Sequence, residues 1–184
     1  MEQLHRQDEP FLTALAAFTA GVAETTVGRY DDALRHLREM RDLAERFDNT
    51  WLAAGSRVQV GALAAVRGRL DEASALLDEG LALSLATHNT HNVSLCLITF
   101  ARLAFVEGDP ERAALLAGAA EGPRRRAGLR AWPMLRRGEA ELAAQIRQTL
   151  GADRFDHVYA AGSRLNQREA VAAIQDPRPS TEEY

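Results

Sequence analysis

The residues with the clearest chemical potential are six arginines that lie between Glu121 and Glu139. No acidic residue lies among them, whereas the rest of the chain carries 16 arginines against 26 acidic residues. Such a cluster can bind phosphate, carboxylate or nucleic acid, and Trp132 could stack on a base. A charge run is also typical of a solvated face or an internal partner for acidic repeats. We predict an anionic or domain-docking patch, and do not favour nucleic acid, for Arg124, Arg125, Arg126, Arg130, Arg136 and Arg137.

Recognisable catalytic and metal-binding patterns are missing from the sequence. It has no Gly-x-Ser-x-Gly, no His-Glu-x-x-His and no glycine-rich phosphate loop. The absence of lysine excludes a P-loop NTPase and a Schiff-base enzyme. His88 and His91 offer only two ligands, without a neighbouring cysteine or acidic cluster. Cys96 lies in an apolar run typical of a packed core thiol. We therefore expect a protein that is not an enzyme, with no metal and no cofactor.

The composition of the 184 residues favours helices throughout. Alanine and leucine make up nearly a third of the chain, and aromatic residues only 6%. The apolar run 11–23 follows two acidic residues where a signal peptide would be basic, so we predict a soluble helix beginning near Pro10. No apolar stretch is long enough to span a bilayer. With a net charge of −4, these features predict a cytoplasmic protein without a membrane partner.

The strongest signal is an internal repeat of 40 residues. Gly28, Gly68 and Gly108 are spaced by 40, and each is followed five residues later by an alanine. Each is also preceded, seven residues earlier, by a small residue: Gly21, Gly61 and Ala101. A glycine that closes a helix adopts the left-handed conformation, and small residues let two helices approach closely. Each copy therefore predicts two antiparallel helices joined by a short turn, and the copies must stack to bury their apolar faces.

These residues resemble the tetratricopeptide repeat. Its small residue, its glycine followed two positions later by an aromatic residue, and its alanine match Gly21, Gly28-Arg29-Tyr30 and Ala33. The period is 40 instead of 34, and Ala17, Arg57 and Leu97 replace the large aromatic residue expected early in the first helix. The resemblance implies an all-α fold: a right-handed α-solenoid of three tetratricopeptide-like hairpins over residues 1–121.

The C-terminal third departs from the repeat. Residues 122–133 predict a loop or a broken helix, followed by an amphipathic helix from Met134 to Leu150. A short helix is expected from Asp153 to Ala161, ending at Gly162. A capping box of Asn166 and Glu169 should begin the last helix. We predict capping helices packed on the stack over residues 122–175, and a disordered tail or linker over 176–184.

Two segments are similar to the helical repeat region of large actinobacterial regulators of the LuxR family, which join an ATPase module to tetratricopeptide-like repeats. These segments are residues 107–121, EGDPERAALLAGAAE, and residues 150–165, LGADRFDHVYAAGSRL. The resemblance covers roughly residues 50–175 and carries no catalytic motif. It implies a domain of a transcriptional or signalling regulator, which is either a fragment of a larger regulator or a stand-alone relative.

We interpret the function as binding of a protein segment or a neighbouring domain in a concave helical groove. The alternative is a sensor whose groove binds a small-molecule effector, and dimerisation through an end helix is compatible with both. In a tetratricopeptide-like stack the first helix of each pair would line the groove. We also consider whether Arg57 pairs with Glu24. The groove residues expected from the resemblance are Phe18, Thr25, Arg57, Ala62, Arg102 and Phe105.

Overall fold

The computed structural model describes the backbone of residues 2–175 and the side chains of 11–133 and 135–174. Over these residues the chain is all helical, without strands. It divides into two compact units, Met1–Asn92 and Val93–Tyr184. The expected boundary after residue 121 stays a prediction, and the predicted tail at 176–184 lies outside the described residues.

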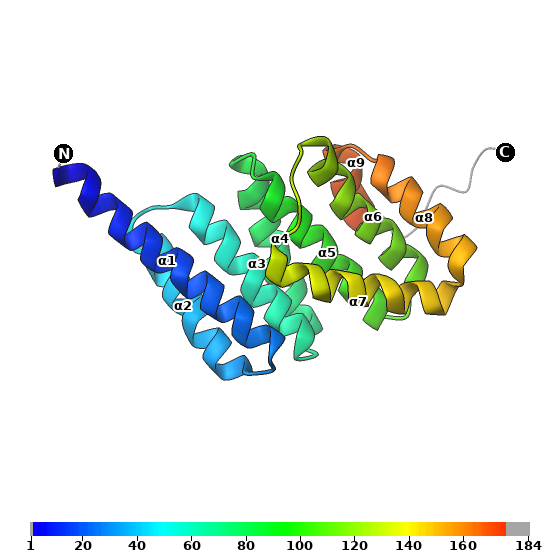
Figure 1. Cartoon of the computed structure of the whole chain (residues 1–184), viewed down its shortest axis with the longest axis horizontal. Helices are drawn as coiled ribbons and strands as arrows, with labels where there is room; N and C mark the ends of the chain where they lie inside the picture. The colour runs from blue at the N-terminus through cyan, green and yellow to red at the C-terminus, as the bar shows by residue number, and fades with distance from the viewer. Residues whose placement is uncertain (1, 176–184) are drawn as a thin grey trace. The chain divides into compact units, whose positions relative to one another are not determined.

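The first unit is built from two helical hairpins and the start of a third (Figure 1). Its helices are α1 (Glu2–Thr26), α2 (Tyr30–Arg46), α3 (Thr50–Val66), α4 (Leu70–Ala86) and the first residues of α5 (Thr90–Val106). Helix α1 packs against α2, α2 against α3, and α3 against α4. The expected start of the first helix at Pro10 is wrong, since α1 runs through that residue from Glu2.

The 40-residue period is visible in the helix boundaries. The second helices of the hairpins, α2, α4 and α6 (Pro110–Arg126), begin 40 residues apart at Tyr30, Leu70 and Pro110. The turn glycines 28, 68 and 108 have φ angles of 79°, 74° and 86°, the left-handed conformation that the sequence predicts.

The paired helices approach each other closely at positions that are also 40 residues apart. A Cβ added at Gly21 would lie 3.3 Å from the Ala33 carbonyl oxygen, and one at Gly61 would lie 3.2 Å from the Ala73 carbonyl oxygen. Both distances are tighter than an ordinary van der Waals contact. The prediction that small residues permit this crossing is therefore confirmed at both hairpins of the first unit.

The second unit contains the remainder of α5, then α6, α7 (Pro133–Leu150), α8 (Ala152–Arg164) and α9 (Gln167–Gln175). Helix α6 packs against α7, α8 and α9, so it is the central element of this unit. The Asp109 side chain caps α6 by accepting from the Arg112 backbone N–H at 2.9 Å, and Pro110 occupies its first turn. The predicted capping box is confirmed, because Asn166 and Glu169 exchange side-chain to backbone hydrogen bonds of 2.8 and 3.0 Å.

Two sequence predictions in this unit are wrong. The break was expected from residue 122, but α6 continues to Arg126 and Pro123 lies inside it. Gly162 was expected to end α8, yet the helix runs on to Arg164. Gly162 is buried, and a methyl group there would overlap the Leu115 carbonyl oxygen of α6. Gly162 therefore allows α6 and α8 to pack closely and does not end a helix.

Candidate functional site: an arginine pocket at the α6–α7 connection

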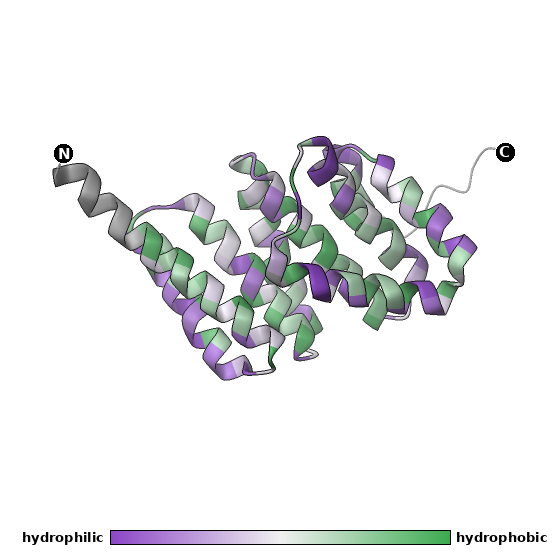
Figure 2. Cartoon of the chain, in the orientation of Figure 1, coloured by the Kyte–Doolittle hydropathy of each residue, from purple (hydrophilic) through white to green (hydrophobic). Residues whose placement is uncertain are grey.

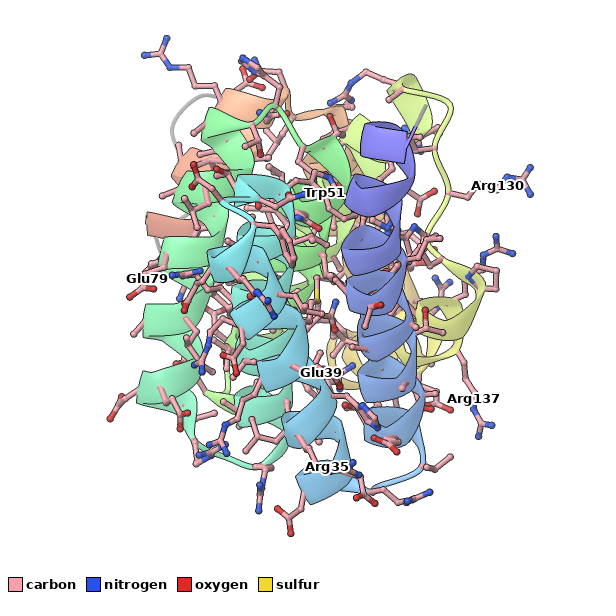
Figure 3. The ribbon with its side chains drawn as sticks, turned by 90° about the vertical axis from the view of Figure 1, so that its left-hand side faces the viewer. Arg35, Glu39, Trp51, Glu79, Arg130 and Arg137 are labelled. Atoms are coloured by element: carbon pink, nitrogen blue, oxygen red, sulfur yellow. The ribbon has the colours of Figure 1, made fainter. Side chains whose placement is uncertain are left out.

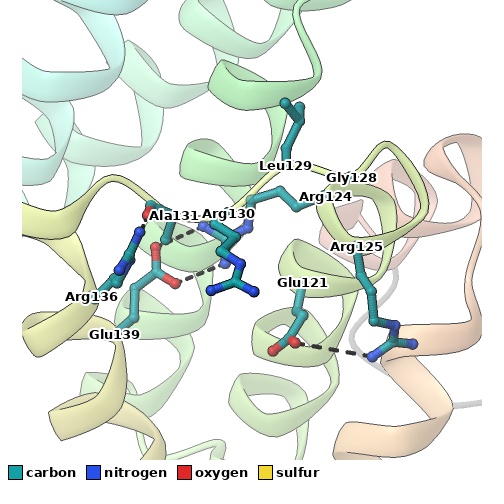
Figure 4. A pocket seen from close by; sticks show the side chains of 9 residues that line it. All are labelled: Glu121, Arg124, Arg125, Gly128, Leu129, Arg130, Ala131, Arg136 and Glu139. Atoms are coloured by element: carbon teal, nitrogen blue, oxygen red, sulfur yellow. Dashed lines mark hydrogen bonds and ion pairs between the residues drawn. The ribbon is translucent and has the colours of Figure 1, made fainter.

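A pocket of about 560 Å³ lies where α6 ends and α7 begins (Figure 4). The last turns of α6, the connecting segment 127–132 and the first turns of α7 supply its walls. Four of the six clustered arginines line it together with two glutamates. The lining residues are Glu121, Arg124, Arg125, Gly128, Leu129, Arg130, Ala131, Arg136 and Glu139.

The connecting segment is fixed by local backbone geometry. Gly128 has φ +68°, which closes α6 in the left-handed conformation. The Gly128 N–H donates to the Arg125 carbonyl at 3.1 Å, and the Leu129 N–H donates to the Arg124 carbonyl at 2.8 Å. Pro133 then occupies the first turn of α7, where a missing N–H costs nothing. These features turn the chain so that both helix ends face one hollow.

An ion pair between α6 and α7 holds one wall of the pocket. Arg124 donates from Nη1 and Nη2 to the two carboxylate oxygens of Glu139 at 2.9 and 2.7 Å. The side chains are only 9% and 17% exposed, so water screens this pair weakly. Burial is the largest single influence and lowers the pKa of Arg124. The hydrogen bonds that Arg124 donates to Glu139 and the negative charges of Glu139 and Glu121 together outweigh burial, so the pKa lies above its usual value. Arg124 is therefore a charged, structural member of the site.

Glu121 lies at another wall and is shared by two partners. The Tyr159 hydroxyl of α8 donates to Glu121 Oε2 at 2.5 Å, and Arg125 Nη1 lies 4.0 Å from Glu121 Oε1. Burial, followed by this hydrogen bond, raises the pKa of Tyr159. The Arg125–Glu121 ion pair is at the limit of contact and both side chains are largely exposed. Arg125 thus keeps most of its hydrogen-bonding capacity for another anion.

The other two lining arginines face no carboxylate among the described side chains. Arg136 donates from Nε to the Ala131 carbonyl at 2.8 Å, which orients its guanidinium and leaves the terminal nitrogens available. Arg130 is exposed, has no polar partner among the described side chains and points away from the ribbon (Figures 3 and 4). The pocket therefore offers cationic donors whose charge is not compensated within this part of the chain.

Two arginines of the predicted patch lie elsewhere. Arg126 donates from Nη1 to the Ser163 carbonyl at 3.0 Å and from Nη2 to the Leu165 carbonyl, so it binds the C-terminal end of α8. Arg137 projects outward from α7 and pairs with Glu141 at 2.8 Å (Figure 3). Sequence reasoning grouped all six by proximity and treated Glu121 and Glu139 only as boundaries. The structure makes these two glutamates part of the site.

The residues expected to line a groove have the following positions. In the first unit Phe18 is buried, Ala62 is half-buried, and the Thr25 hydroxyl donates to the Gly21 carbonyl at 2.8 Å. Arg57 pairs with Glu79 of α4 at 3.0 Å. The suggested pairing of Arg57 with Glu24 is therefore wrong. Glu24 lies 3.7 Å from His36 Nε2.

In the second unit, Arg102 and Phe105 of α5 are half-buried. Arg102 Nη2 donates to the Gly138 carbonyl of α7 at 3.5 Å. Burial lowers the pKa of Arg102, and the Glu141 carboxylate opposes that effect. This arginine therefore has an internal partner, as an arginine within an apolar helix requires.

No protein-family model, curated protein or solved structure matches the chain. The described residues contain no group of three histidine, cysteine or acidic side chains suited to a metal ion. Across the same residues, no helix has both the length and the apolar character needed to cross a membrane.

Proposed function

We propose that this chain is a protein-interaction domain of a transcriptional or signalling regulator, and that it binds an amphipathic helix of a partner or of a neighbouring domain. In this proposal the hairpins are units of a right-handed, tetratricopeptide-like α-solenoid. The likeness of residues 107–121 and 150–165 to the repeat region of actinobacterial regulators supports the regulatory role. The observation that carries the proposal is an outer face of α1 that bears no charge over residues 12–23, within the part of the helix whose side chains the structure describes.

This outer face of α1 consists of Leu12, Ala16, Thr19 and Ala23, all exposed. Leu12 is 60% exposed, and Val27 beyond the end of the helix is 70% exposed. In Figure 2 the coloured part of α1 shows mainly green and pale shades, whereas purple residues are frequent along α2. An exposed helix face without charges is unusual in a chain of which 26% is charged.

The repeat supports a helix-binding role for this face. Forty residues later, the corresponding positions of α3 are Leu52, Ser56, Gln59 and Leu63, and all four are buried. Leu52 is 2% exposed and Leu63 is fully buried, against 60% for Leu12. Positions that correspond in the repeat are therefore buried on α3 and exposed on α1.

Helix α2 provides part of the cover on α3. Leu63 packs in a cluster with Ala33 and Leu37 of α2, and a Cβ at Gly55 would lie 3.2 Å from Met40 Cε. Helix α1 is the counterpart of α3 in the 40-residue repeat. Its outer face therefore corresponds to the surface of α3 that packs against α2, and it should accept a helix similar to α2. The expected partner is an amphipathic helix with Ala, Leu, Met and Ala spaced as in residues 33, 37, 40 and 44 of this chain.

A labelled peptide with the sequence of residues 30–46 tests this proposal by fluorescence anisotropy. We expect saturable binding to the wild-type chain and at least a roughly tenfold loss for Ala23→Glu, because the charge would be buried in the contact. Ala82→Glu, at another exposed alanine, in α4, is the matched control and should bind normally. Equal affinity of both variants, or no binding by the wild type, contradicts the proposal. Dimerisation that Ala23→Glu abolishes would assign the face to a second copy instead.

The second candidate is a small-molecule sensor, favoured by the arginine pocket. Its volume lies within the range of ligand pockets, and four arginines line it, of which Arg130 and Arg136 have no carboxylate partner among the described side chains. A thermal-melt screen against small anions separates this function from helix binding, because the residues concerned belong to α6 and α7 and not to α1.

A further inference from the structure

We propose that the arginine pocket binds the phosphate monoester group of a small phosphorylated molecule. This site is separate from the α1 face and does not rest on helix binding. Its residues belong to the unit Val93–Tyr184, whereas the outer face of α1 belongs to Met1–Asn92. Either activity can therefore fail in an experiment without affecting the other.

Charge balance indicates the class of ligand. Four arginines and two glutamates line the pocket, which leaves two positive charges uncompensated. Glu139 neutralises Arg124 through two hydrogen bonds, and Glu121 lies 4.0 Å from Arg125. Arg130 and Arg136 have no carboxylate partner among the described side chains. A dianion balances these two charges, and a phosphate monoester carries a charge between about −1.5 and −2 at neutral pH.

The donors are arranged for oxyanion recognition. Guanidinium groups bind phosphate through paired N–H donors, which adds geometric selection to charge. Arg136 is oriented by the Ala131 carbonyl at 2.8 Å, so its remaining N–H groups are held in place before a ligand arrives. Arg130 stands on the connecting segment between the helices, lines the pocket and is exposed (Figure 4).

The dimensions of the pocket indicate a ligand larger than free phosphate. About 560 Å³ is typical of a cavity for an organic molecule, far more than a phosphate ion requires. Leu129 and Ala131 supply an apolar wall beside the arginines. The phosphate would contact Arg130 and Arg136, and the body of the molecule would lie along that wall.

Calorimetric titration with inorganic phosphate, glucose 6-phosphate and glucose tests the proposal. We expect saturable binding of both phosphates, no binding of glucose, and affinity that falls as salt is added. Arg130→Gln and Arg136→Gln should each weaken phosphate binding by roughly tenfold, the usual effect of losing a charged hydrogen bond. Arg137→Gln is the matched control, because Arg137 lies one residue away but pairs with Glu141 outside the pocket.

Arg130→Gln keeps the test independent of folding, since this exposed side chain has no internal partner among the described residues. Unchanged phosphate affinity in both variants would overturn the proposal. So would an absence of saturable binding of either phosphate by the wild type up to roughly 10 mM ligand. Equal or tighter binding of succinate would show that the pocket selects carboxylates, which also overturns the assignment to phosphate.

Discussion

Arg124 and Glu139, fifteen residues apart in sequence, form a two-pronged ion pair that joins the end of α6 to the start of α7. Both side chains are largely buried, and the pocket forms around them. The pair connects the two helices on either side of the segment 127–132. It therefore positions Arg130 and Arg136 without itself being available to a ligand.

Removal of one member of this pair should be costly. Glu139→Gln removes the carboxylate that is hydrogen-bonded to the buried Arg124 guanidinium, and we expect a loss of about 2–4 kcal/mol in the free energy of unfolding. Urea denaturation followed by circular dichroism measures it. Arg137→Gln removes one member of the exposed Arg137–Glu141 ion pair, so its unfolding curve should match the wild type. Similar losses in both variants would show that burial does not strengthen the Arg124 pair.

The contact between α6 and α8 depends on glycines. A Cβ at Gly162 would overlap the Leu115 carbonyl oxygen, and one at Gly118 would overlap the Tyr159 carbonyl oxygen. Gly162→Ala should therefore destabilise the protein by about 2–4 kcal/mol, because two backbones must separate. Gly138→Ala is the control, since its Cβ would meet only the Arg102 guanidinium at 3.8 Å and alanine favours the helix. A neutral Gly162→Ala would contradict the close packing, and differential scanning calorimetry provides the comparison.

Replacing one residue of the turn after α4 by glycine should raise the stability of the protein. His88 follows α4 with φ +51°, although it is not a glycine. Left-handed backbone costs a side-chain-bearing residue about 1–2 kcal/mol, and glycine avoids this at a smaller entropic cost. His88→Gly should therefore stabilise the chain by roughly 0.5–1 kcal/mol. Gly68→Ala, at φ +74° with open space around it, should destabilise by roughly 1 kcal/mol. Thermal unfolding of the two variants should shift the midpoint in opposite directions, and shifts of the same sign would contradict the role of φ.

Tyr159 should make stability depend on alkaline pH. Burial and the hydrogen bond to Glu121 raise its folded-state pKa above the ordinary value of 10.0. Above that value the unfolded chain loses a proton that the folded protein keeps, so the unfolded state is favoured. The stability that this raised pKa contributes is fully present below pH 10 and is lost as pH rises further.

Denaturation of the wild type and Tyr159→Phe across this range measures the effect. The loss of stability with rising pH should be shallower in the variant, because phenylalanine has no proton to lose. Parallel curves for the two proteins would show that Tyr159 ionises normally.

Much of the local structure could be predicted from the sequence, because it depends on short-range chemistry. Left-handed glycines at 28, 68 and 108 end the first helix of each hairpin, and the cap at Asp109 begins α6. The capping box of Asn166 and Glu169 is likewise a local exchange of hydrogen bonds. These features involve residues a few positions apart, so the pattern alone identifies them.

The repeat also predicted close packing at Gly21 and Gly61, but Gly162 was misread as the end of a helix. A glycine within a helix serves either as a terminator or as a point of close approach, and only its neighbours in space distinguish the two. For Gly162 the neighbour is the Leu115 carbonyl oxygen, 47 positions earlier in the chain. The sequence contains no local sign of that contact.

The arginine cluster, too, could be predicted in part from the sequence and in part depends on tertiary structure. Its residues and its lack of internal acids could be read from the sequence, and so could the loop that follows α6. Which arginines face one hollow was decided by the turn between α6 and α7 and by the Arg124–Glu139 pair. Charge density is a property of the chain, but convergence of charges requires that separate helices fix their side chains in space. The sequence by itself therefore determined the helices, their caps and their repeat, while tertiary packing decided which cations remained uncompensated.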